Sequence, residues 1–478
     1  MSSNKPTETL ELVSGDLMQP AQSETDRVSG GASGGSLQSG KFDALARDCG
    51  VVGASAALWE PETSLTLMTF GTVNRKSVLE PMKTSHRFRI SCLSKVVIGS
   101  VATKLLMDRG IAFSEPVRRH FPDLLRRSDP VDDTISFLNL LNYSVGFDET
   151  NLWKHLREMT LLAELPSRLS GIKQLCPPGR HYIYSPVSAL MLAYILEKLE
   201  RRPWDEVVSE YLLAKANAPP DAIATHWKHV DLADSSLNGH LLDVSPDAYP
   251  ESTCLFRQIT ESMHIQLTPS ELCLVGSNIA RLLECNAVRE TLANRTIGRS
   301  RMPDNHYVGG ATFSLLCYHN GCMGFWANGL GQMIMLMIEP RTQRVLAAAT
   351  NSFPETLFLT ELADTIFGRP VLRQECPPLF QLDQCTGLYG SEGLQIIVRE
   401  LRGEFFADVH RWDDFGLRTV SGKLHYTGRR EYLLVDGGRP VGLDRLSFFS
   451  EPGASEPEFA RFANKVCKRR LPTGSVLL

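Results

Sequence analysis

Residues 88–97 read FRISCLSKVV and carry the clearest chemical pattern in the chain. Cys92 stands three positions before Lys95, and apolar residues continue after them at helical spacing as far as Gly110. The pattern predicts a helix from Cys92 to Gly110, a residue type favoured just beyond a helix end. A thiol at the start of this helix faces unpaired N–H groups and the positive end of the helix dipole, and Lys95 projects from the same face. Both effects favour the thiolate, so Cys92 is a candidate nucleophile rather than the buried core residue that a free cysteine usually is.

Sheet patterns lie on both sides of this helix in the sequence. VVGASAALWE (51–60) and SLTLMTFGTVN (64–74) are apolar runs separated by a Glu-Pro turn, which predicts a hairpin. GQMIMLMIEPRTQRVLAAATNS (331–352) predicts two central antiparallel strands, and PETLFLTELADTIFG (354–368) predicts a closing helix. The order predicts an α+β fold in which an antiparallel sheet is flanked by helices and a helical subdomain is inserted between its segments. Further helices are predicted at about residues 42–50, 134–142 and 185–200.

Composition shifts divide the chain into three parts. Residues 1–40 are rich in Ser, Gly, Thr and Glu and end in SGGASGGSLQSG, which predicts a flexible tail. Residues 41–370 hold the sheet and helix patterns and form the predicted catalytic domain. After prolines at 370, 377 and 378 come short β-rich runs such as LQIIVREL and EFFADVHRW, separated by turn residues at regular spacing. They predict a small C-terminal β-barrel domain at 378–478.

Bulk properties exclude several function classes. A formal net charge of −4 with no basic tract gives no electrostatic footprint for nucleic acid or for an anionic membrane. The start of the sequence has no signal-peptide pattern, and no run approaches 18 apolar residues, so a cytoplasmic protein is expected. Eleven cysteines without a CxxC pair indicate reduced thiols rather than disulfides or a metal site. Neither a metal nor an organic cofactor is expected.

Two further blocks accompany the first. PPGRHYIYSPVSALMLAYILEKL covers residues 177–199, and YHNGCMGF covers 318–325. In this order the three blocks resemble the FRIxSxxK, YSN and HxG motifs of the penicillin-recognising serine hydrolases, a superfamily of class C β-lactamases, DD-peptidases, esterases and acyltransferases. The resemblance spans about residues 42–367, and the C-terminal β-domain is similar to the lipocalin-like extension of some members. It implies the β-lactamase/transpeptidase-like fold.

The resemblance also implies a role for individual residues. Cys92 takes the position of the nucleophilic serine, Lys95 that of a base or proton relay, and Tyr184 that of the group that exchanges a proton with nucleophile and leaving group. His319 flanks the cavity and orients Tyr184 or a substrate carboxylate. The backbone N–H groups of Cys92 and Cys322 form the oxyanion hole. The expected substrate-binding residues are Tyr143, Pro186, Asn320 and Gly321.

Each of these residues also has an ordinary structural explanation. Most lysines are solvated at the surface, but Lys95 is followed by valine and isoleucine, which indicates that it points inward. Tyr184 alone fits a core tyrosine with a hydrogen-bonded hydroxyl, and His319 alone fits a histidine at the edge of a strand. The three blocks together favour the catalytic interpretation.

Several positions depart from the family pattern. Cys92 replaces serine, Pro186 replaces the asparagine of YSN, and Tyr143 and Val145 replace the histidine and serine of an LLTHTSG-like stretch. The loss of the asparagine amide argues against ordinary β-lactam recognition. A catalytically decayed binding or scaffold protein is the alternative that such losses favour. Against decay, the serine has become another nucleophile rather than alanine or glycine.

A thiol nucleophile favours particular reactions. A thioester intermediate reacts with amines in preference to water more than an oxygen ester does, so acyl transfer from a small-molecule or carrier-bound acyl donor is expected. Hydrolysis of an ester, thioester or amide stays open as the simpler alternative. A cytosolic acyltransferase fits biosynthetic, secondary metabolism, where thioester donors are made. The acyl group, the acceptor and the oligomeric state are not determined by the sequence.

Overall fold

The computed structural model describes residues 39–61, 65–73, 80–125, 133–213, 236–237, 240–241, 255–260, 265–291, 296–301, 307–318, 321–329, 331–353, 356–368, 377–413, 416–427, 430–450, 453–462 and 465–470. Of the predicted tail, residues 1–38 lie outside these ranges, and Ser39 and Gly40 already belong to the first helix, α1 (Ser39–Asp48).

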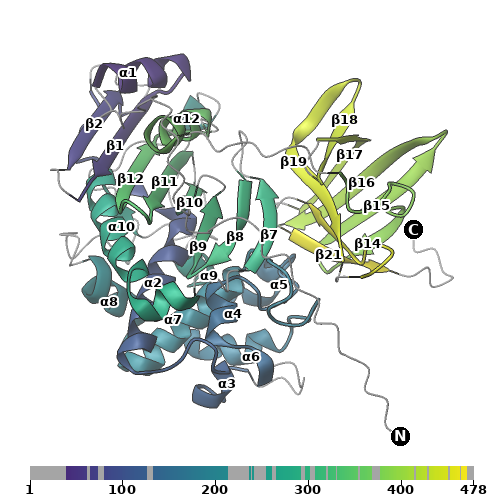
Figure 1. Cartoon of the computed structure of the whole chain (residues 1–478), viewed down its shortest axis with the longest axis horizontal. Coiled ribbons are helices and arrows are strands. Elements are labelled where there is room, and N and C mark those ends of the chain that lie inside the picture. Colours follow the sequence, from purple (N-terminus) through teal and green to yellow (C-terminus); the bar gives the residue numbers. More distant parts are fainter. Residues whose placement is uncertain are drawn as a thin grey trace, which may run out of the picture. The chain divides into compact units, whose positions relative to one another are not determined.

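An eight-stranded antiparallel sheet forms the centre of the first domain (Figure 1). The two predicted hairpins are confirmed: β1 pairs with β2, and β11 pairs with β12. Antiparallel pairing of β1 with β12 joins these two hairpins, although they are far apart in the sequence. Along the sheet the strands are β2 (Thr66–Gly71), β1 (Gly53–Trp59), β12 (Arg344–Thr350), β11 (Gln332–Glu339), β10 (Met323–Gly329), β9 (Leu315–Tyr318), β8 (Tyr307–Thr312) and β7 (Thr296–Arg301).

Helices cover the central strands from both faces, which is why β11 is buried along almost its whole length. Helix α10 (Pro269–Leu283) packs on β1, β11 and β12, with α2 (Ser94–Asp108) beside it. Helix α12 (Thr356–Phe367) packs on β11 and β12 and contacts α1 through an edge-to-face pair of Phe42 and Phe358. The predicted closing helix is therefore confirmed, and the apolar runs of β11 and β12 are explained by burial on two sides.

The inserted helical subdomain lies between β2 and β7 in the chain. The helix predicted at 185–200 is α7 (Pro186–Glu200), and the one predicted at 134–142 is the shorter α4 (Phe137–Leu141), which starts after a capping box at Ser136. The other helical elements are η1 (Ser91–Leu93), α3 (Val117–His120), α5 (Leu152–Leu156), η3 (Leu162–Glu164), α6 (Leu165–Leu169), α8 (Trp204–Val208), η4 (Ser209–Leu213), α9 (Leu255–Thr260) and α11 (Asn286–Thr291). The short strands are β3 (Phe88–Arg89), β4 (Ser236–Leu237), β5 (His240–Leu241), β6 (Gln266–Leu267) and β13 (Ser352–Phe353).

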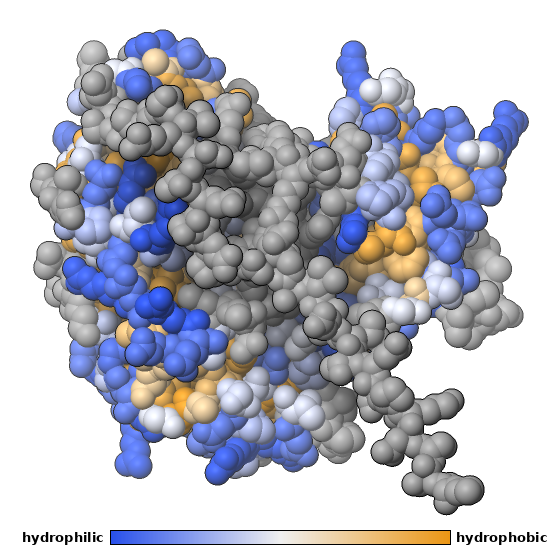
Figure 2. Space-filling view, in the orientation of Figure 1, coloured by the Kyte–Doolittle hydropathy of each residue, from blue (hydrophilic) through white to orange (hydrophobic). Residues whose placement is uncertain are grey.

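The C-terminal part is a closed eight-stranded barrel, as predicted. Each strand pairs antiparallel with the next in sequence, and β14 closes the barrel against β21. Alternate residues point inward, so β15 reads buried and half-buried in turn over its first five residues. Figure 2 shows apolar side chains gathered on part of the barrel's visible face. The strands are β14 (Gly387–Gly390), β15 (Leu394–Leu401), β16 (Glu404–Asp413), β17 (Gly416–Tyr426), β18 (Tyr432–Asp436), β19 (Arg439–Phe449), β20 (Phe459–Phe462) and β21 (Lys465–Arg470).

Three general properties of the described residues bear on function. None of their helices is long and apolar enough to cross a membrane. Within the same ranges no group of three or more His, Cys, Asp or Glu side chains is arranged to hold a metal ion. The nine cysteines that these ranges contain are free thiols.

Candidate active site

Cys92 lies on the 3-10 turn η1, which leads directly into helix α2. The preceding residue, Ser91, has a φ of +48°, in the left-handed region that residues with a side chain rarely adopt. Its hydroxyl donates a hydrogen bond to the carbonyl of Asn328 on β10 at 2.5 Å, which holds the turn against the sheet. The α-helix thus begins at Ser94, later than the sequence indicates, because the left-handed Ser91 imposes a tight turn before it. The Cys92 side chain is partly exposed.

Lys95 is the second residue of α2, and it is only 1% exposed. Its ammonium donates a hydrogen bond to the carbonyl of Thr260 at the end of α9. The ammonium nitrogen also lies 5.2 Å from the ring centroid of Tyr184, a separation at which a cation is attracted to an aromatic face. The side chain therefore points into the protein, toward the tyrosine of the second block.

Tyr184 precedes the first turn of α7, and its hydroxyl lies near enough to the Cys92 thiol of the first block for the two groups to interact electrostatically. Its ring packs against those of Tyr143 and Phe325, with centroids 5.7 and 5.9 Å away. Burial, followed by the neighbouring Cys92, raises the pKa of Tyr184 well above its ordinary value. At neutral pH this phenol is protonated and is placed to give a proton.

Tyr143 is buried, and its hydroxyl donates a hydrogen bond to the carbonyl of Ser314 at 3.0 Å. Burial raises its pKa well above the ordinary value of a tyrosine. Its carbonyl accepts the N–H of Ile183 at 2.9 Å, so the segment before Tyr184 is attached to it. In the structure Tyr143 supports the ring and the backbone of Tyr184, and its predicted role in substrate binding stays a prediction.

The start of α7 contains a buried acid that the sequence did not point to. Ser185 caps the helix, accepting the N–H of Ser188, and Pro186 occupies the first turn, where its missing N–H costs nothing. The Glu149 carboxylate, 2% exposed, accepts the Ser185 hydroxyl and the N–H of Val187. Burial raises the pKa of Glu149 to about 8, against the Ser185 hydrogen bond and the positive charges of Lys465 and Lys95. The one signal in the sequence is the polar run DET at 148–150, directly after an apolar stretch.

The third block forms the turn between β9 and β10. Tyr318 and Cys322 pair across it, with the Tyr318 N–H donating to the Cys322 carbonyl at 2.9 Å, and Gly321 has a φ of +83° that favours glycine. The Cys322 thiol is buried, and burial raises its pKa, so the thiol itself is unreactive. His319 and Asn320 lie outside the described residues. The oxyanion hole of backbone N–H groups stays a prediction.

The structure thus brings the three blocks to one place. Tyr184 from the second block lies beside Cys92 and Lys95 from the first, and its ring packs on Phe325, the last residue of the third block, on β10. A thiol, a protonated phenol and a buried ammonium stand next to one another. Groups of these kinds serve as nucleophile, proton donor and neighbouring positive charge in acyl-transfer enzymes.

Comparison with known proteins gives the same picture of the fold. A family model described as Beta-lactamase matches residues 39–367. The structure of SurE with D-Leu has a TM-score of 0.68 and 16% identity over 90% of this chain and 98% of that one. D-amino acid amidase from Ochrobactrum anthropi SV3, complexed with L-phenylalanine amide, has a TM-score of 0.52 and 17% identity over 68% of this chain and 95% of that one. The octameric penicillin-binding protein homologue from Pyrococcus abyssi has a TM-score of 0.53 and 14% identity over 90% and 100%.

At these identities the solved structures are alike in fold alone. No curated protein matches the sequence.

Proposed function

This chain belongs to the beta-lactamase family, and from that premise we propose that it is an acyl-transfer enzyme with Cys92 as its nucleophile. The observation that carries the proposal is that the Lys95 ammonium lies 5.2 Å from the ring centroid of Tyr184, whose hydroxyl is near the Cys92 thiol. A core cysteine needs neither neighbour. A nucleophilic thiolate is stabilised by a nearby positive charge, and its leaving group needs a proton donor.

The first half-reaction forms a thioester. Cys92 gives its proton to water before the reaction, and the resulting thiolate attacks the acyl carbonyl, so that a carbon–sulfur bond forms as the carbonyl π bond breaks. As the tetrahedral intermediate collapses, the bond to the leaving group breaks and the leaving group takes the proton of Tyr184. The phenolate that remains is stabilised by the Lys95 ammonium 5.2 Å from the ring centroid. The raised pKa of Tyr184 suits this role, because the phenol is protonated before the reaction.

The second half-reaction runs in the opposite sense. An amine, thiol or water molecule gives its proton to the Tyr184 phenolate and attacks the thioester carbonyl. The carbon–sulfur bond then breaks, releasing the acylated acceptor and the Cys92 thiolate. Amines are favoured over water at a thioester, so we propose transfer rather than hydrolysis as the main outcome, in biosynthetic metabolism within the cytoplasm. We propose that no metal or organic cofactor takes part, since protein groups supply every proton transfer.

The alternative is a decayed member that binds ligands without covalent chemistry. It is favoured by Pro186, which removes the family's amide, and opposed by Tyr184 and Lys95, which stand beside Cys92. The two differ in one observable, an acyl group attached to Cys92.

The test is intact-mass measurement after exposure to a panel of acyl donors. The panel contains N-acetylcysteamine thioesters, p-nitrophenyl esters and amino acid amides, because one fold neighbour is an amino acid amidase. We expect at least one donor to add its acyl mass to Cys92, located by peptide mapping, and Cys92→Ala to show no adduct. Absence of an adduct with every donor, together with Cys92 alkylation by iodoacetamide no faster than in the unfolded chain, would establish the binding-protein alternative.

A further inference from the structure

We propose that the C-terminal barrel is part of the catalytic apparatus, because its residue Arg461 binds the backbone before Tyr184 and its residue Lys465 is linked through Glu149 to the chain after Tyr184. Both are positioning residues, since they act on Tyr184 rather than on substrate. The inference rests on the proposed function of Tyr184 as the proton donor.

Arg461 contacts the chain just before Tyr184. It lies on β20, is 6% exposed, and its guanidinium donates a hydrogen bond to the carbonyl of Tyr182. The guanidinium carbon also lies 5.6 Å from the ring centroid of Tyr182 and 5.0 Å from that of Phe449. Because the next residue along, Ile183, donates its N–H to Tyr143, the approach to Tyr184 is held by the barrel on one side and the first domain on the other.

Lys465 acts on the chain just after Tyr184. Its ammonium, at the start of β21, donates a hydrogen bond to the carbonyl of Glu149 at 2.5 Å. The carboxylate of the same Glu149 accepts the Ser185 hydroxyl and the N–H of Val187. Lys465 is thus linked through one residue to the peptide that comes after Tyr184. Its positive charge also favours the ionised form of the Glu149 carboxyl.

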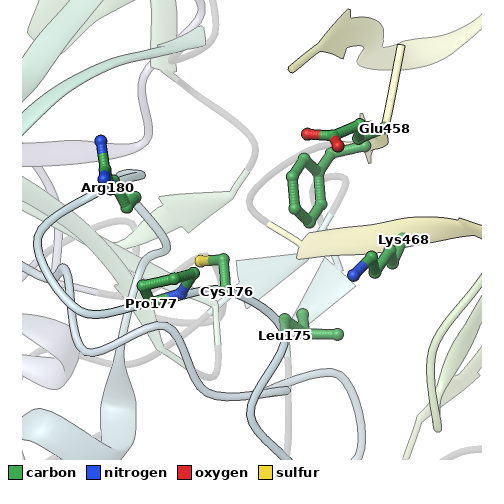
Figure 3. A pocket seen from close by; sticks show the side chains of 7 residues that line it. Leu175, Cys176, Pro177, Arg180, Glu458 and Lys468 are labelled. Carbon is green, nitrogen blue, oxygen red and sulfur yellow. The ribbon is translucent and has the colours of Figure 1, made fainter. Parts of the chain in front are cut away.

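Among the described residues, apolar and ring contacts also join the two domains beside these bonds. One small cluster, Cys176, Ile183, Phe459 and Val466, joins the loop before Tyr184 to β20 and β21. Beside it a pocket of about 550 Å³ remains open, lined by Cys176, Pro177 and Arg180 from the loop and by Glu458, Phe459 and Lys468 from the barrel (Figure 3). Arg461 and Lys465 add polar contacts that lead to Tyr184.

A second set of contacts attaches the barrel without leading to Tyr184, and it provides the control. The Glu392 carboxylate, in the turn between β14 and β15, bonds to Lys154 at 2.5 Å and to His155 at 2.8 Å on α5. Glu392→Gln weakens this attachment and leaves both connections to Tyr184 in place. Arg469→Met is the control for loss of a barrel guanidinium, since Arg469 bonds to Thr386 and Glu456 within the barrel domain.

The experiment is a double-mutant cycle on the full chain. Arg461→Met, Lys465→Met and Tyr184→Phe are made singly, and the first two are also combined with Tyr184→Phe. The readouts are the rate of Cys92 alkylation by iodoacetamide, which needs no acyl donor, and the single-turnover rate of Cys92 acylation by an N-acetylcysteamine thioester. We expect Arg461→Met and Lys465→Met to slow acylation by about tenfold to a hundredfold, the scale of a misplacement of about 1 Å.

The double-mutant cycle distinguishes failure of the positioning role from failure of the proposed function of Tyr184. If Arg461 and Lys465 act through Tyr184, their substitution has no further effect once Tyr184 is phenylalanine, and Arg461→Lys restores part of the rate. An Arg461→Met effect that adds in full to that of Tyr184→Phe, or that Glu392→Gln and Arg469→Met reproduce, overturns the positioning role. If Tyr184→Phe itself changes neither readout, the proposed function fails instead. If Arg461→Met does not fold, Arg461→Lys and Lys465→Met test the positioning role in the same way.

Discussion

At the residue scale, we propose that the change of one atom, from the family's serine oxygen to the Cys92 sulfur, alters the chemistry of both half-reactions. A thiol ionises near neutral pH far more readily than a hydroxyl, so attack by sulfur needs less help from a base than attack by oxygen does. The site around Cys92 fits that chemistry, because Tyr184 is held as a protonated phenol and Lys95 as its neighbouring cation. Both groups assist departure of the leaving group more than removal of a proton from the nucleophile.

Cys92→Ser tests this interpretation. We expect a folded protein whose acylation rate is lower by about 10²-fold, the scale of one missing proton transfer, because the buried Tyr184 phenol already carries its proton and cannot take that of the serine hydroxyl. Any remaining turnover should shift from transfer toward hydrolysis, measured as the ratio of the two products. Cys285→Ser, at a partly exposed thiol with no assigned role, serves as the control and should keep the normal rate. Equal rates for Cys92→Ser and the unchanged protein would show that the site is built for a hydroxyl.

Glu149 gives the molecule a pH dependence. Its folded pKa of about 8 lies above the ordinary value of about 4.3 for an unfolded glutamate, chiefly because the carboxyl is buried. The folded state therefore binds the proton more tightly than the unfolded state does. The stability that this group contributes is fully present below pH about 4.3 and is lost as the pH rises toward about 8.

Glu149→Gln should remove this dependence. We expect the free energy of unfolding of the unchanged protein to fall, relative to the variant, between pH 5 and pH 8 by roughly 1.4 kcal/mol for each pH unit within the window. Urea denaturation of both proteins across this range measures the difference. A difference that stays constant from pH 5 to pH 8 would mean that Glu149 is ionised throughout.

At the element scale, the turn between β14 and β15 depends on a glycine. The Gly393 N–H donates to the Thr150 hydroxyl at 2.8 Å, and the Glu392 N–H donates to Asp148 at 2.9 Å. A Cβ atom at position 393 would lie 2.3 Å from the backbone carbonyl oxygen of Thr150, closer than any real contact. Only a residue without a side chain lets this turn reach the first domain.

Gly393→Ala should therefore loosen the barrel from residues 148–155. We expect a loss of about 1–3 kcal/mol in unfolding free energy, the usual cost of overpacking, with faster amide hydrogen exchange in that segment. Gly403→Ala is the control, because a Cβ there meets nothing within 4 Å, and only its φ of +78° is strained. Unchanged exchange at 148–155 in Gly393→Ala would contradict the role given to the turn.

At the scale of the whole molecule, we expect the first 38 residues to be dispensable. Their Ser- and Gly-rich composition offers too little apolar surface to offset the entropy lost on ordering. Deletion of residues 1–38 should leave the melting temperature and the rate of Cys92 acylation nearly unchanged. A large loss of either, with α1 retained from Ser39, would show that the segment contributes to the body of the protein or to the site.

The sequence by itself determined the elements whose signals are local. Alternating and continuous apolar runs predicted β1, β2, β11, β12 and the barrel strands, and the three blocks predicted that Cys92, Lys95 and Tyr184 belong together. The tertiary structure alone decided how Tyr184 is held. Neither the left-handed Ser91 nor the buried Glu149 has a clear signal in the sequence. The bond of Arg461 to Tyr182 spans 279 positions, and the bond of Lys465 to Glu149 spans 316. The two long-range bonds form only when the barrel packs on the first domain. A polar residue can be predicted to be buried only if its hydrogen-bond partner is known, because burial without a partner costs too much free energy.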